Sequence, residues 1–461
     1  TYMSIDRNVG SRHSYLAQRT TSPAYNALRY KAYKALRKLR LVKEGNKSSI
    51  LRFNNSLKSL LSKQQNIFEW LNIRYFGPFD GHDIKRIVRV LNDIKDLKGP
   101  KLLHLRTVKG KGYAPAEKDP ACWHAPGKFD PETGERQKPA AQQPPKYQEV
   151  FGKTLVELAE KDDRIVGITA AMPSGTSISE LQKTMPNRTF DVGISEGHAV
   201  TFAGGLAKAG KKPFVAIYSS FLQRGYDHII HDVAIARLPV VFCIDRAGIV
   251  GEDGVTHHGL YDLSYLSTIP GMIVSSPSDE MTLRNLMLTA SRHDEGPFAI
   301  RYPRGGGKNL EWRNAMIELK IGKGRKLAEG SDAVILSLGP IAHEVAKAID
   351  KLKGKYSVAH YDMIYLKPID EEILSEAVAK NAPIFTVEDA SINGGLGSAV
   401  ASWLSDHKIN CRLRRIAVPD EFISQGTVAQ LYKQCGIDAA SIAEAVEETL
   451  SESIIHKKII N

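Results

Sequence analysis

One carboxylate, Glu196, stands between an apolar run at 189–194 and a run rich in small residues at 198–210. The apolar run predicts a short buried strand, and the small residues predict a helix packed closely on a sheet. Glu196 would then lie at the carboxyl end of a strand, the edge where open α/β sheets bind their ligands. The helix dipole also favours an acid in the first turn, so position alone supports a catalytic and a structural role equally.

Three further loops carry side chains capable of chemistry. Tyr218, Phe221 and Arg224 lie at or just after the end of the strand expected at 213–219; Asp245, Arg246, Asp253, His257 and His258 lie at or after the end of the one at 239–245; Arg301 and Arg304 lie at or after the end of the one at 298–302. We expect these loops to meet Glu196 at one sheet edge. Arg246 and Arg304 together fit a clamp for phosphate or carboxylate. The competing interpretations are an Arg246–Asp245 pair, solvated histidines and a basic turn.

A second reactive group, His82, Lys109 and His124, lies on loops rich in glycine and proline, a setting that often serves binding sites. Neither glycine-rich stretch there has the spacing of a dinucleotide fingerprint or a nucleotide P-loop. No histidine and cysteine spacing fits a zinc site, so no metal cluster of that kind is expected.

From residue 147 the chain alternates between predicted strands and helices. Strands are expected at 164–170, 189–194, 213–219, 239–245, 271–276 and 298–302, with helices at 147–160, 198–210, 225–236 and 279–290. This alternation predicts a parallel sheet covered on both faces. A second α/β unit is expected from 319, with strands at 332–339, 356–362, 384–389 and 411–418. The polar, proline-rich stretch 131–146 is predicted to be a linker.

Composition is ordinary for a globular protein, at 461 residues with 42% hydrophobic and 25% charged residues. No apolar run reaches the roughly 18 residues of a membrane span, so we expect no membrane association. Residues 1–65 hold 14 lysines and arginines against two acids, which accounts for the whole formal charge of +12. A solvated basic helix explains this segment better than a nucleic-acid partner, which would bind with steep salt dependence. Four cysteines without paired spacing indicate a reducing compartment.

Many motifs occur together in one order along the chain. They are GPFDGHD, KGKGYAPAEKDP, WHAPGKFD, ISEGHAVTFAGGLA, AIYSSFLQRGYDHIIHDVA, IDRAGIVGEDG, SPSDE, RYPRG and VEDASINGGLGSAV. In these motifs the chain resembles the 1-deoxy-D-xylulose 5-phosphate synthase family over essentially its whole length. The resemblance implies an α/β protein with three doubly wound domains of transketolase type, the first incomplete. It divides the chain into 1–130, the linker 131–146, a pyrimidine-binding domain 147–318 and a C-terminal domain 319–461.

The resemblance implies a thiamine diphosphate-dependent transferase. It would condense pyruvate with D-glyceraldehyde 3-phosphate and release carbon dioxide, as the first step of non-mevalonate isoprenoid precursor synthesis. Carried over by position, the catalytic residues are Glu196, His124, His257 and Asp253; Glu196, Phe221, Lys109 and Met172 bind the cofactor; and Tyr218, Arg246 and Arg304 bind substrate. Glu196 would hydrogen-bond the aminopyrimidine ring, and Phe221 would stack on it.

One departure from the family concerns the metal. The Gly-Asp-Gly and Asn-Asp-Asn motifs that hold Mg²⁺ and the diphosphate in this family do not occur in the sequence. The resemblance places them upstream of Thr1 and makes Met3 a possible neighbour of the metal. It also implies a homodimer, in the bacterial cytoplasm or the plastid stroma. Two alternatives stay open, namely a transketolase that uses a ketose donor, and a non-autonomous pyrimidine-half subunit of a split enzyme.

Overall fold

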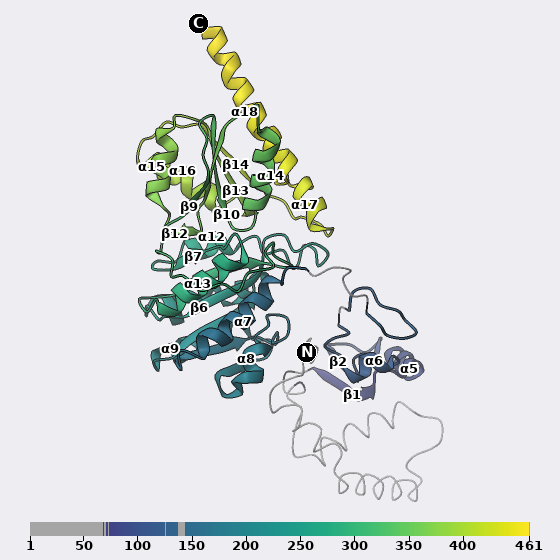
Figure 1. The fold of residues 1–461 in the computed structure, drawn as a ribbon. Coiled ribbons are helices and arrows are strands. Elements are labelled where there is room, and N and C mark those ends of the chain that lie inside the picture. Colours follow the sequence, from purple (N-terminus) through teal and green to yellow (C-terminus); the bar gives the residue numbers. More distant parts are fainter. Residues whose placement is uncertain (1–67, 69–70, 72, 125, 137–142, 461) are drawn as a thin grey trace, which may run out of the picture. The chain divides into compact units, whose positions relative to one another are not determined.

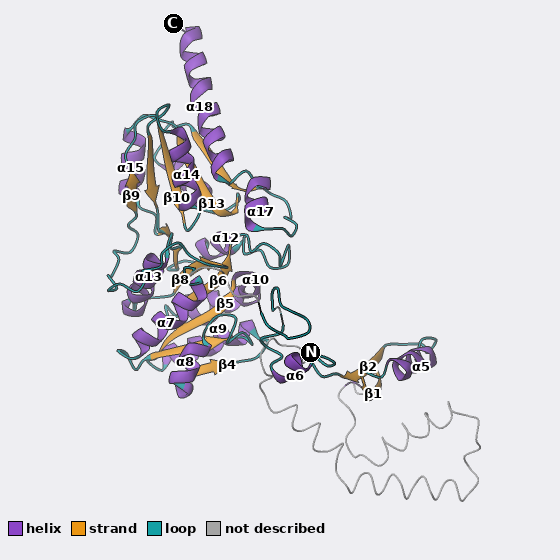
Figure 2. Ribbon diagram, turned by 45° about the vertical axis from the view of Figure 1, so that its right-hand side comes forward, coloured by secondary structure: helices purple, strands orange, loops and turns teal. Residues whose placement is uncertain are grey.

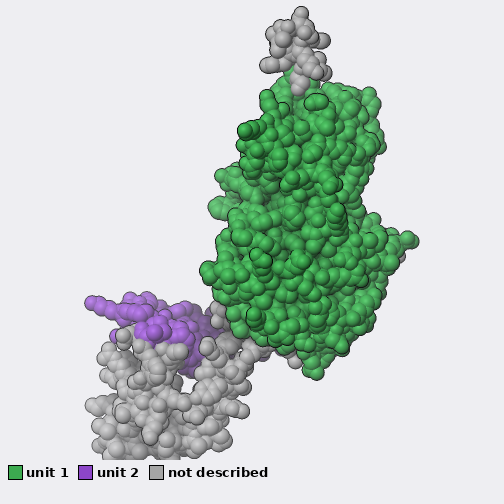
Figure 3. All heavy atoms as spheres, turned by 90° about the vertical axis from the view of Figure 1, so that its left-hand side faces the viewer, with its two compact units in different colours: residues 1–9, 138–461 green, residues 10–137 purple. Residues whose placement is uncertain are grey.

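The computed structural model describes the chain except for residues 1–67, 69–70, 72, 125, 137–142 and 461. The chain folds into two compact units. Unit 1 contains Thr1–Val9 and Lys138–Asn461, and unit 2 contains Gly10–Gln137; Figure 3 colours them green and purple. The basic segment 1–65 and Met3 lie outside the described residues. The boundaries at residues 130, 146 and 318 stay predictions.

Unit 2 contains one βαβ element. Strands β1 (Arg74–Asp80) and β2 (Lys101–Arg106) pair in parallel, and helix α5 (Ile84–Ile94) connects them. The Asp83 side chain caps α5 by accepting a hydrogen bond from the Arg86 N–H group at 3.0 Å. A short helix, α6 (Ala114–Lys118), follows with a proline in its first turn. Strand β2 therefore leads into the loop that carries Lys109.

Unit 1 contains a seven-stranded sheet with the order β12-β7-β8-β6-β5-β3-β4. Figure 2 draws the strands in orange. The strands of this sheet are β3 (Ile165–Thr169), β4 (Thr189–Asp191), β5 (Lys212–Tyr218), β6 (Val241–Ala247), β7 (Ile273–Ser275), β8 (Phe298–Pro303) and β12 (Tyr365–Lys367). All neighbouring strands are parallel except β12, which pairs with β7 in the antiparallel sense. The predicted parallel sheet is confirmed, and β12 is an addition from the C-terminal part of the chain.

Helices cover both faces of this sheet, because successive strand residues point to opposite sides. They are α7 (Tyr147–Ala159), α8 (Ser179–Thr184), α9 (Glu196–Lys208), α10 (Ser219–Leu222), α11 (Tyr226–His228), α12 (Asp262–Ser267) and α13 (Glu280–Arg292), with short 3₁₀ turns at Pro186–Arg188 and Gln223–Gly225. Phe214 and Cys243 face the core beneath α7 and α13, whereas Val215 and Phe242 face the core beneath α9. This alternation explains why the strands read as continuous apolar runs.

The segment predicted as one helix at 225–236 departs from regular α geometry. It begins as α11 and continues as a π-helical turn over Ile229–Ala234. The Ile235 N–H group donates to the Ile230 carbonyl at 3.0 Å, a bond that spans five residues. Ile229 and Val233, four residues apart, both lie in the core that α9 also enters. The helical periodicity therefore predicts the buried face of this segment but not its π-helical hydrogen bonding.

A second sheet in unit 1 has five strands in the order β14-β13-β10-β11-β9. They are β9 (Arg325–Ala328), β10 (Ala333–Leu338), β11 (Val358–Asp362), β13 (Ile384–Ser391) and β14 (Leu413–Val418); the accompanying helices are α14 (Ala342–Leu352), α15 (Glu371–Ala379), α16 (Leu396–Asp406), α17 (Val428–Gln434) and α18 (Ala439–Ile460). Helix α18 packs on α14 and projects past the sheet in Figure 1. None of the helices in the described part of the chain is long and apolar enough to cross a membrane.

The two sheets of unit 1 share buried side chains. One apolar cluster joins Val215 and Phe242 of the first sheet to Leu336 and Tyr361 of the second. Strand β12 lies between β11 and β13 in the sequence, both of which belong to the second sheet, but it pairs with the first sheet. Its Tyr365 is fully buried in the apolar cluster that also contains Phe214 and Cys243. The regions that form the first and the second sheet therefore fold against a common interior.

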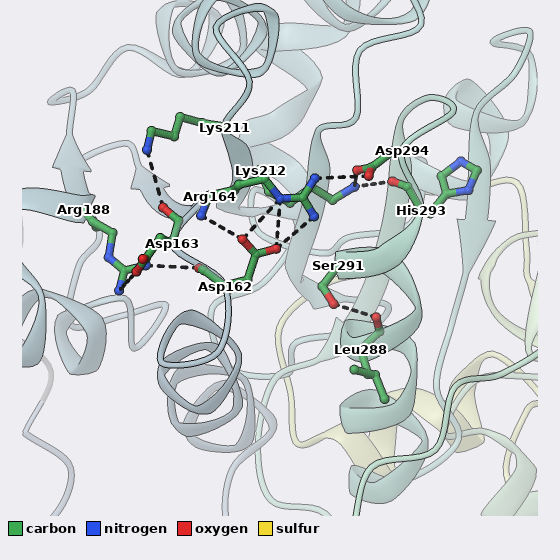
Figure 4. A network of polar contacts seen from close by, with 10 residues as sticks. All are labelled: Asp162, Asp163, Arg164, Arg188, Lys211, Lys212, Leu288, Ser291, His293 and Asp294. Atoms are coloured by element: carbon green, nitrogen blue, oxygen red, sulfur yellow. Dashed lines mark hydrogen bonds and ion pairs between the residues drawn. The ribbon is translucent and has the colours of Figure 1, made fainter.

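A network of ion pairs closes the amino-terminal edge of the first sheet (Figure 4). Arg164 contacts the Asp162 carboxylate at 2.9 Å and the Asp294 carboxylate at 3.1 Å. Lys212, whose side chain is 1% exposed, contacts Asp294 at 3.3 Å and donates to the His293 carbonyl. Burial lowers the pKa of Lys212 to about 8, although Asp294 opposes this shift. The network joins the segments that lead into β3, β5 and β8, at the sheet edge opposite Glu196.

Candidate active site

Four loops at the carboxyl edge of the first sheet carry the candidate residues. Glu196 begins α9 just after β4, Tyr218 ends β5, Arg246 lies near the end of β6, and Arg304 directly follows β8. Because these strands are parallel, their loops emerge at one edge. The structure brings these residues together with Phe221, His257, Asp253 and Met172, through the contacts below.

Glu196 is the first residue of α9, and its side chain is 7% exposed. Its Oε1 atom accepts a hydrogen bond from Nη1 of Arg224 at 3.0 Å. A favourable helix dipole accounts for an acid at this position but not for its burial, because a carboxylate taken out of water needs compensating partners. Burial beside Arg224 therefore favours a functional role over that of an ordinary first-turn acid.

Phe221 lies at the centre of the cluster. Its ring stacks on that of Tyr218, with centroids 5.4 Å apart and planes inclined by 22°. The Arg224 guanidinium lies 5.4 Å from the ring centroid, and the His257 imidazole meets the ring edge-on at 5.5 Å. Phe221 thus connects the Glu196–Arg224 pair to the loop that carries His257. The spacing of three residues between Phe221 and Arg224 places both on one helical turn, which is the signal that associates them in the sequence.

Arg246 has an unusual backbone conformation, with a φ angle of +58°. A left-handed conformation at a residue other than glycine costs about 1–3 kcal/mol and often marks a functional site. The side chain is 14% exposed, and its guanidinium lies 3.8 Å from the centroid of the Tyr218 ring. Nη1 donates to Asp245 at 2.8 Å, the Gly175 carbonyl at 3.1 Å and Gln148 at 3.2 Å. The suspected pair with Asp245 is present, but the ring contact means that pairing is not the whole role of Arg246.

Asp245 lies beneath this arginine and is fully buried. Its Oδ1 atom accepts from the Arg246 backbone N–H group at 2.7 Å. Burial raises the pKa of Asp245 to about 6, and the charge of Arg246 and its hydrogen bonds oppose this shift. Burial likewise raises the pKa of Tyr218. Asp245 therefore anchors Arg246 at both its backbone and its guanidinium.

Met172 lies beside Tyr218. A Cβ atom added at Gly175 would come within 2.3 Å of the Tyr218 hydroxyl and 2.7 Å of the Met172 methyl group. Both side chains therefore pack on the Gly175 backbone, whose carbonyl also accepts from Arg246. Sequence reasoning gave no role to Gln148 or Gly175, because both reach the cluster through tertiary contacts rather than through a strand-end motif.

Arg304 contacts the loop that carries Asp253 and His257. Its Nη1 atom donates to the Val250 carbonyl at 2.7 Å and forms ion pairs with Glu252 at 3.1 Å and Asp253 at 3.5 Å. The Arg304 side chain is 36% exposed and the two carboxylates more so. Exposed pairs of this kind are worth about 0–1 kcal/mol, so an anionic ligand could displace them.

Unit 2 contains the second reactive group. Nε2 of His82 accepts from the Val108 N–H group at 2.7 Å, which places His82 next to the residue before Lys109. Burial, and then the positive charge of Lys109, lower the pKa of His124. Trp123 forms edge-to-face ring contacts with Tyr113 at 5.0 Å and Phe129 at 4.8 Å. These rings hold the two motif loops together within this unit.

Comparison with known proteins matches three family descriptions to successive parts of the chain. "1-deoxy-D-xylulose-5-phosphate synthase" matches residues 1–107, "Transketolase, pyrimidine binding domain" matches 143–308, and "Transketolase, C-terminal domain" matches 322–442. Among solved structures, a split-gene transketolase described as an inactive β4 tetramer is 30% identical, with a TM-score of 0.59 over 66% of this chain and 98% of its own. A transketolase from Pichia stipitis is 18% identical, with a TM-score of 0.55 over 68% of this chain and 46% of its own.

The fold and the strand-edge cluster define a protein of the transketolase class. Among curated relatives, the 1-deoxy-D-xylulose-5-phosphate synthase of Parabacteroides distasonis is 55% identical over 97% of this chain and 71% of its own length. That of Bacteroides thetaiotaomicron is 55% identical over 96% of this chain and 69% of its own length. The chain belongs to the 1-deoxy-D-xylulose-5-phosphate synthase family.

Proposed function

We propose that the chain catalyses the thiamine diphosphate-dependent condensation of pyruvate with D-glyceraldehyde 3-phosphate to 1-deoxy-D-xylulose 5-phosphate and carbon dioxide. The observation that carries the proposal is the buried Glu196 carboxylate, paired with the exposed Arg224 beside Phe221, in a chain 55% identical to a curated synthase of that name. The two solved transketolases compared above are 30% and 18% identical, below the 55% of the curated synthase, which favours the synthase over a ketose-dependent transketolase.

The described residues fit the pyrimidine half of the cofactor. A buried carboxylate, Glu196, lies near an aromatic face, Phe221, and Arg224 contacts both. When bound, thiamine diphosphate supplies the electron sink for decarboxylation and carbon–carbon bond formation. Glu196 would hold a proton at the aminopyrimidine nitrogen, since a carboxyl group in a site sheltered from water keeps its hydrogen bond strong. Phe221 would orient the ring by stacking, and Met172 would pack on the same cofactor.

D-glyceraldehyde 3-phosphate is the acceptor substrate in this reaction. We assign its recognition to the end of the cluster that contains Arg246 and Arg304. Arg246 is held in place by Asp245 and Tyr218, and Arg304 by weak exposed pairs. Guanidinium groups match the geometry of phosphate oxygens, so both arginines would bind the phosphate of glyceraldehyde 3-phosphate with Tyr218. Asp253 and His257 would orient substrate and move protons.

For unit 2 we propose that Lys109 binds the diphosphate and that His124 handles a proton, because the lowered pKa of His124 keeps its imidazole neutral near pH 7. Mg²⁺ with Met3 as its neighbour is proposed from the family resemblance alone. The described residues contain no group of three histidine, cysteine, aspartate or glutamate side chains that could hold a metal ion. No catalytic step is therefore assigned to a metal on these residues. A homodimer in the cytoplasm or plastid stroma completes the proposal.

The test is product formation from ¹³C-labelled pyruvate and glyceraldehyde 3-phosphate with thiamine diphosphate and Mg²⁺, followed by NMR. We expect 1-deoxy-D-xylulose 5-phosphate, and a loss of about 10²-fold or more in kcat for Glu196→Gln, because an amide cannot exchange the proton. The control is Glu180→Gln on α8, a partly exposed acid paired with Lys183, which should keep the rate of the unmodified chain. Near-normal turnover of Glu196→Gln would contradict the assignment.

A second candidate function is a subunit of a split enzyme, favoured by the 30% identity to a split-gene transketolase whose chain is covered to 98%. In that case the chain alone forms no product. Activity should appear when it is mixed with a polypeptide carrying the Gly-Asp-Gly and Asn-Asp-Asn motifs of the family. The same motifs directly upstream in one reading frame would rule this candidate out.

A further inference from the structure

The loop that carries Asp253 and His257 is closed at its base by a two-residue bridge. The backbone N–H groups of Gly248 and Gly259 each donate to the other's carbonyl at 2.8 Å. The residues flanking this bridge inside and outside the loop, Ile249 and Leu260, are 3% and 4% exposed. Both belong to an apolar cluster whose other members all lie between residues 333 and 450. The loop therefore starts and ends inside the core of the C-terminal region.

One carboxylate of that region binds the base of the loop directly. Asp389, on β13, accepts from the Ile249 N–H group at 3.0 Å through Oδ1 and 3.2 Å through Oδ2. The Tyr432 hydroxyl donates to Oδ2 of the same carboxylate at 2.7 Å. The Ile249 N–H group and the Tyr432 hydroxyl both donate, and the oxygens of Asp389 accept from both. Tyr432 therefore fixes the carboxylate that fixes Ile249.

The backbone of the loop is shaped to receive this carboxylate. Gly248 has a φ angle of +77°, and a Cβ atom there would lie 2.2 Å from Oδ2 of Asp389. Only glycine leaves room for so close an approach at this backbone conformation. Arg301 adds a second connection, because its Nη2 atom donates to the Asp389 carbonyl at 3.0 Å and to the Gly259 carbonyl at 3.2 Å. Both ends of the loop are thus tied to the same residue of β13.

The interior of the loop is held from the same side. Nδ1 of His258 accepts from the Val250 N–H group at 3.2 Å, and its Nε2–H group donates to the Ser424 carbonyl at 3.2 Å. Glycines 251 and 254 pack against the segment 425–428. The opposite side of the loop meets the candidate site, where Arg304 binds Val250 and His257 meets Phe221. The loop is therefore a connection between the C-terminal region and the site.

We propose that Asp389, fixed by Tyr432, is a positioning residue that sets the geometry of loop 248–259 and thereby places Asp253 and His257 for the acceptor. The role of the loop in binding the acceptor rests on the proposed function, whereas the anchoring of the loop by Asp389 does not. A residue of the C-terminal region that touches no reacting atom would then govern acceptor binding, because a small misplacement of a binding group lowers the rate steeply.

The first measurement is backbone hydrogen exchange of the full chain by mass spectrometry, without substrates. In Asp389→Asn one amide oxygen replaces two carboxylate oxygens, so the Ile249 N–H group loses one of its two acceptors, and the Tyr432 hydroxyl faces an NH₂ group to which it cannot donate. We expect exchange in peptides covering 248–259 to accelerate about tenfold, since the hydrogen bonds that hold the Ile249 N–H group are weakened. Tyr432→Phe keeps the Ile249 contact and should produce a smaller acceleration in the same peptides.

The matched control is the neighbouring buried acid. Glu388 caps α16 by accepting from the Leu396 and Gly397 N–H groups at 2.7 and 2.8 Å, and it makes none of the described contacts to the loop. Glu388→Gln should accelerate exchange around residues 394–400 and leave 248–259 unchanged. This contrast separates local anchoring from general loosening of the C-terminal region.

The second measurement is steady-state kinetics. For Asp389→Asn we expect KM for glyceraldehyde 3-phosphate to rise about tenfold while KM for pyruvate stays within about twofold. Unchanged exchange at 248–259 in both Asp389→Asn and Tyr432→Phe would overturn the anchoring. Faster exchange with unchanged acceptor KM would overturn the positioning role. If the unmodified chain forms no product, the proposed function fails, while the exchange result still decides the anchoring.

Discussion

Arg246 shows how one side chain is prepared for binding before a ligand arrives. Its left-handed backbone, its stacking on Tyr218 and its two contacts with Asp245 fix the guanidinium in advance. Fixing a long side chain in the folded protein removes much of the entropy cost that binding would otherwise carry. This arrangement has a free-energy cost, because the Asp245 carboxyl group that holds Arg246 is fully buried.

The first prediction concerns the pH dependence that Asp245 introduces. Its pKa in the folded chain, about 6, lies above the ordinary 3.8, so between these values the folded state binds a proton that the unfolded state has lost. The free energy of unfolding should therefore fall in this window as pH rises, by about 1.4 kcal/mol per unit of pKa difference. In Asp245→Asn this contribution is absent. Urea unfolding at several pH values between 4 and 7, for both proteins, measures the difference.

The control for this prediction is Asp163→Asn, because the Asp163 side chain is fully exposed. Its curve should run parallel to that of the unmodified chain across the same window. An Asp245→Asn curve that is also parallel would show that burial does not shift the Asp245 carboxyl group.

At the scale of the element, the base of loop 248–259 depends on a glycine for two separate reasons. Gly248→Ala would impose a left-handed conformation on alanine and push its Cβ atom against the Asp389 carboxylate. Gly354→Ala imposes a similar φ of +80° with no atom within 4 Å. We expect Gly354→Ala to cost about 1 kcal/mol and Gly248→Ala at least about 1–2 kcal/mol more. Equal costs in denaturant unfolding would show that the close approach of Asp389 adds nothing.

Lys212 gives the amino-terminal sheet edge a pH dependence of opposite sign. Its pKa of about 8 in the folded chain lies below the ordinary 10.5, so between these values the unfolded state binds the additional proton. The free energy of unfolding should rise as pH increases from about 8 to 10, relative to Lys212→Met. The neighbouring exposed residue supplies the control, because Lys211→Met should show no such gain. Unfolding curves at pH 7.5, 9 and 10 test the sign.

The strands and the sheet edge that carries the site could be predicted, because each strand is encoded by a run of neighbouring residues in the sequence. Short apolar runs predict β3, β5, β6, β8 and β10, and the reactive residues lie at or directly after the ends of β5, β6 and β8. The sequence also identifies Glu196 and Arg246 as candidates. It gives no sign of β12, which has three residues, or of the Asp389–Ile249 contact, whose partners are 140 positions apart. The φ of Arg246 also requires tertiary packing, since no local pattern demands a left-handed arginine.

At the scale of the whole molecule, unit 1 should unfold as one body although two family descriptions divide it. Its two sheets share an apolar cluster, exchange strand β12 and are tied by the buried Arg301. Scanning calorimetry of the fragment 138–461 should show one transition with a calorimetric to van't Hoff enthalpy ratio of about one. Tyr365→Ala, which empties a fully buried site on β12, should lower stability by about 3 kcal/mol or more without splitting the transition. Two resolved transitions would contradict this prediction.

Strand β12 also determines how family members can be recombined. A hybrid with its crossover at the sequence border between the two matched domains would take β7 from one parent and its partner β12 from the other. It would also combine the Gly248 of one parent with the residue at 389 of the other, at a distance that tolerates no added atom. Functional hybrids should therefore inherit 143–308 and the segments around 365–367 and 389 from the same parent. The parts that must stay together are defined by their contacts in the fold and not by continuity along the chain.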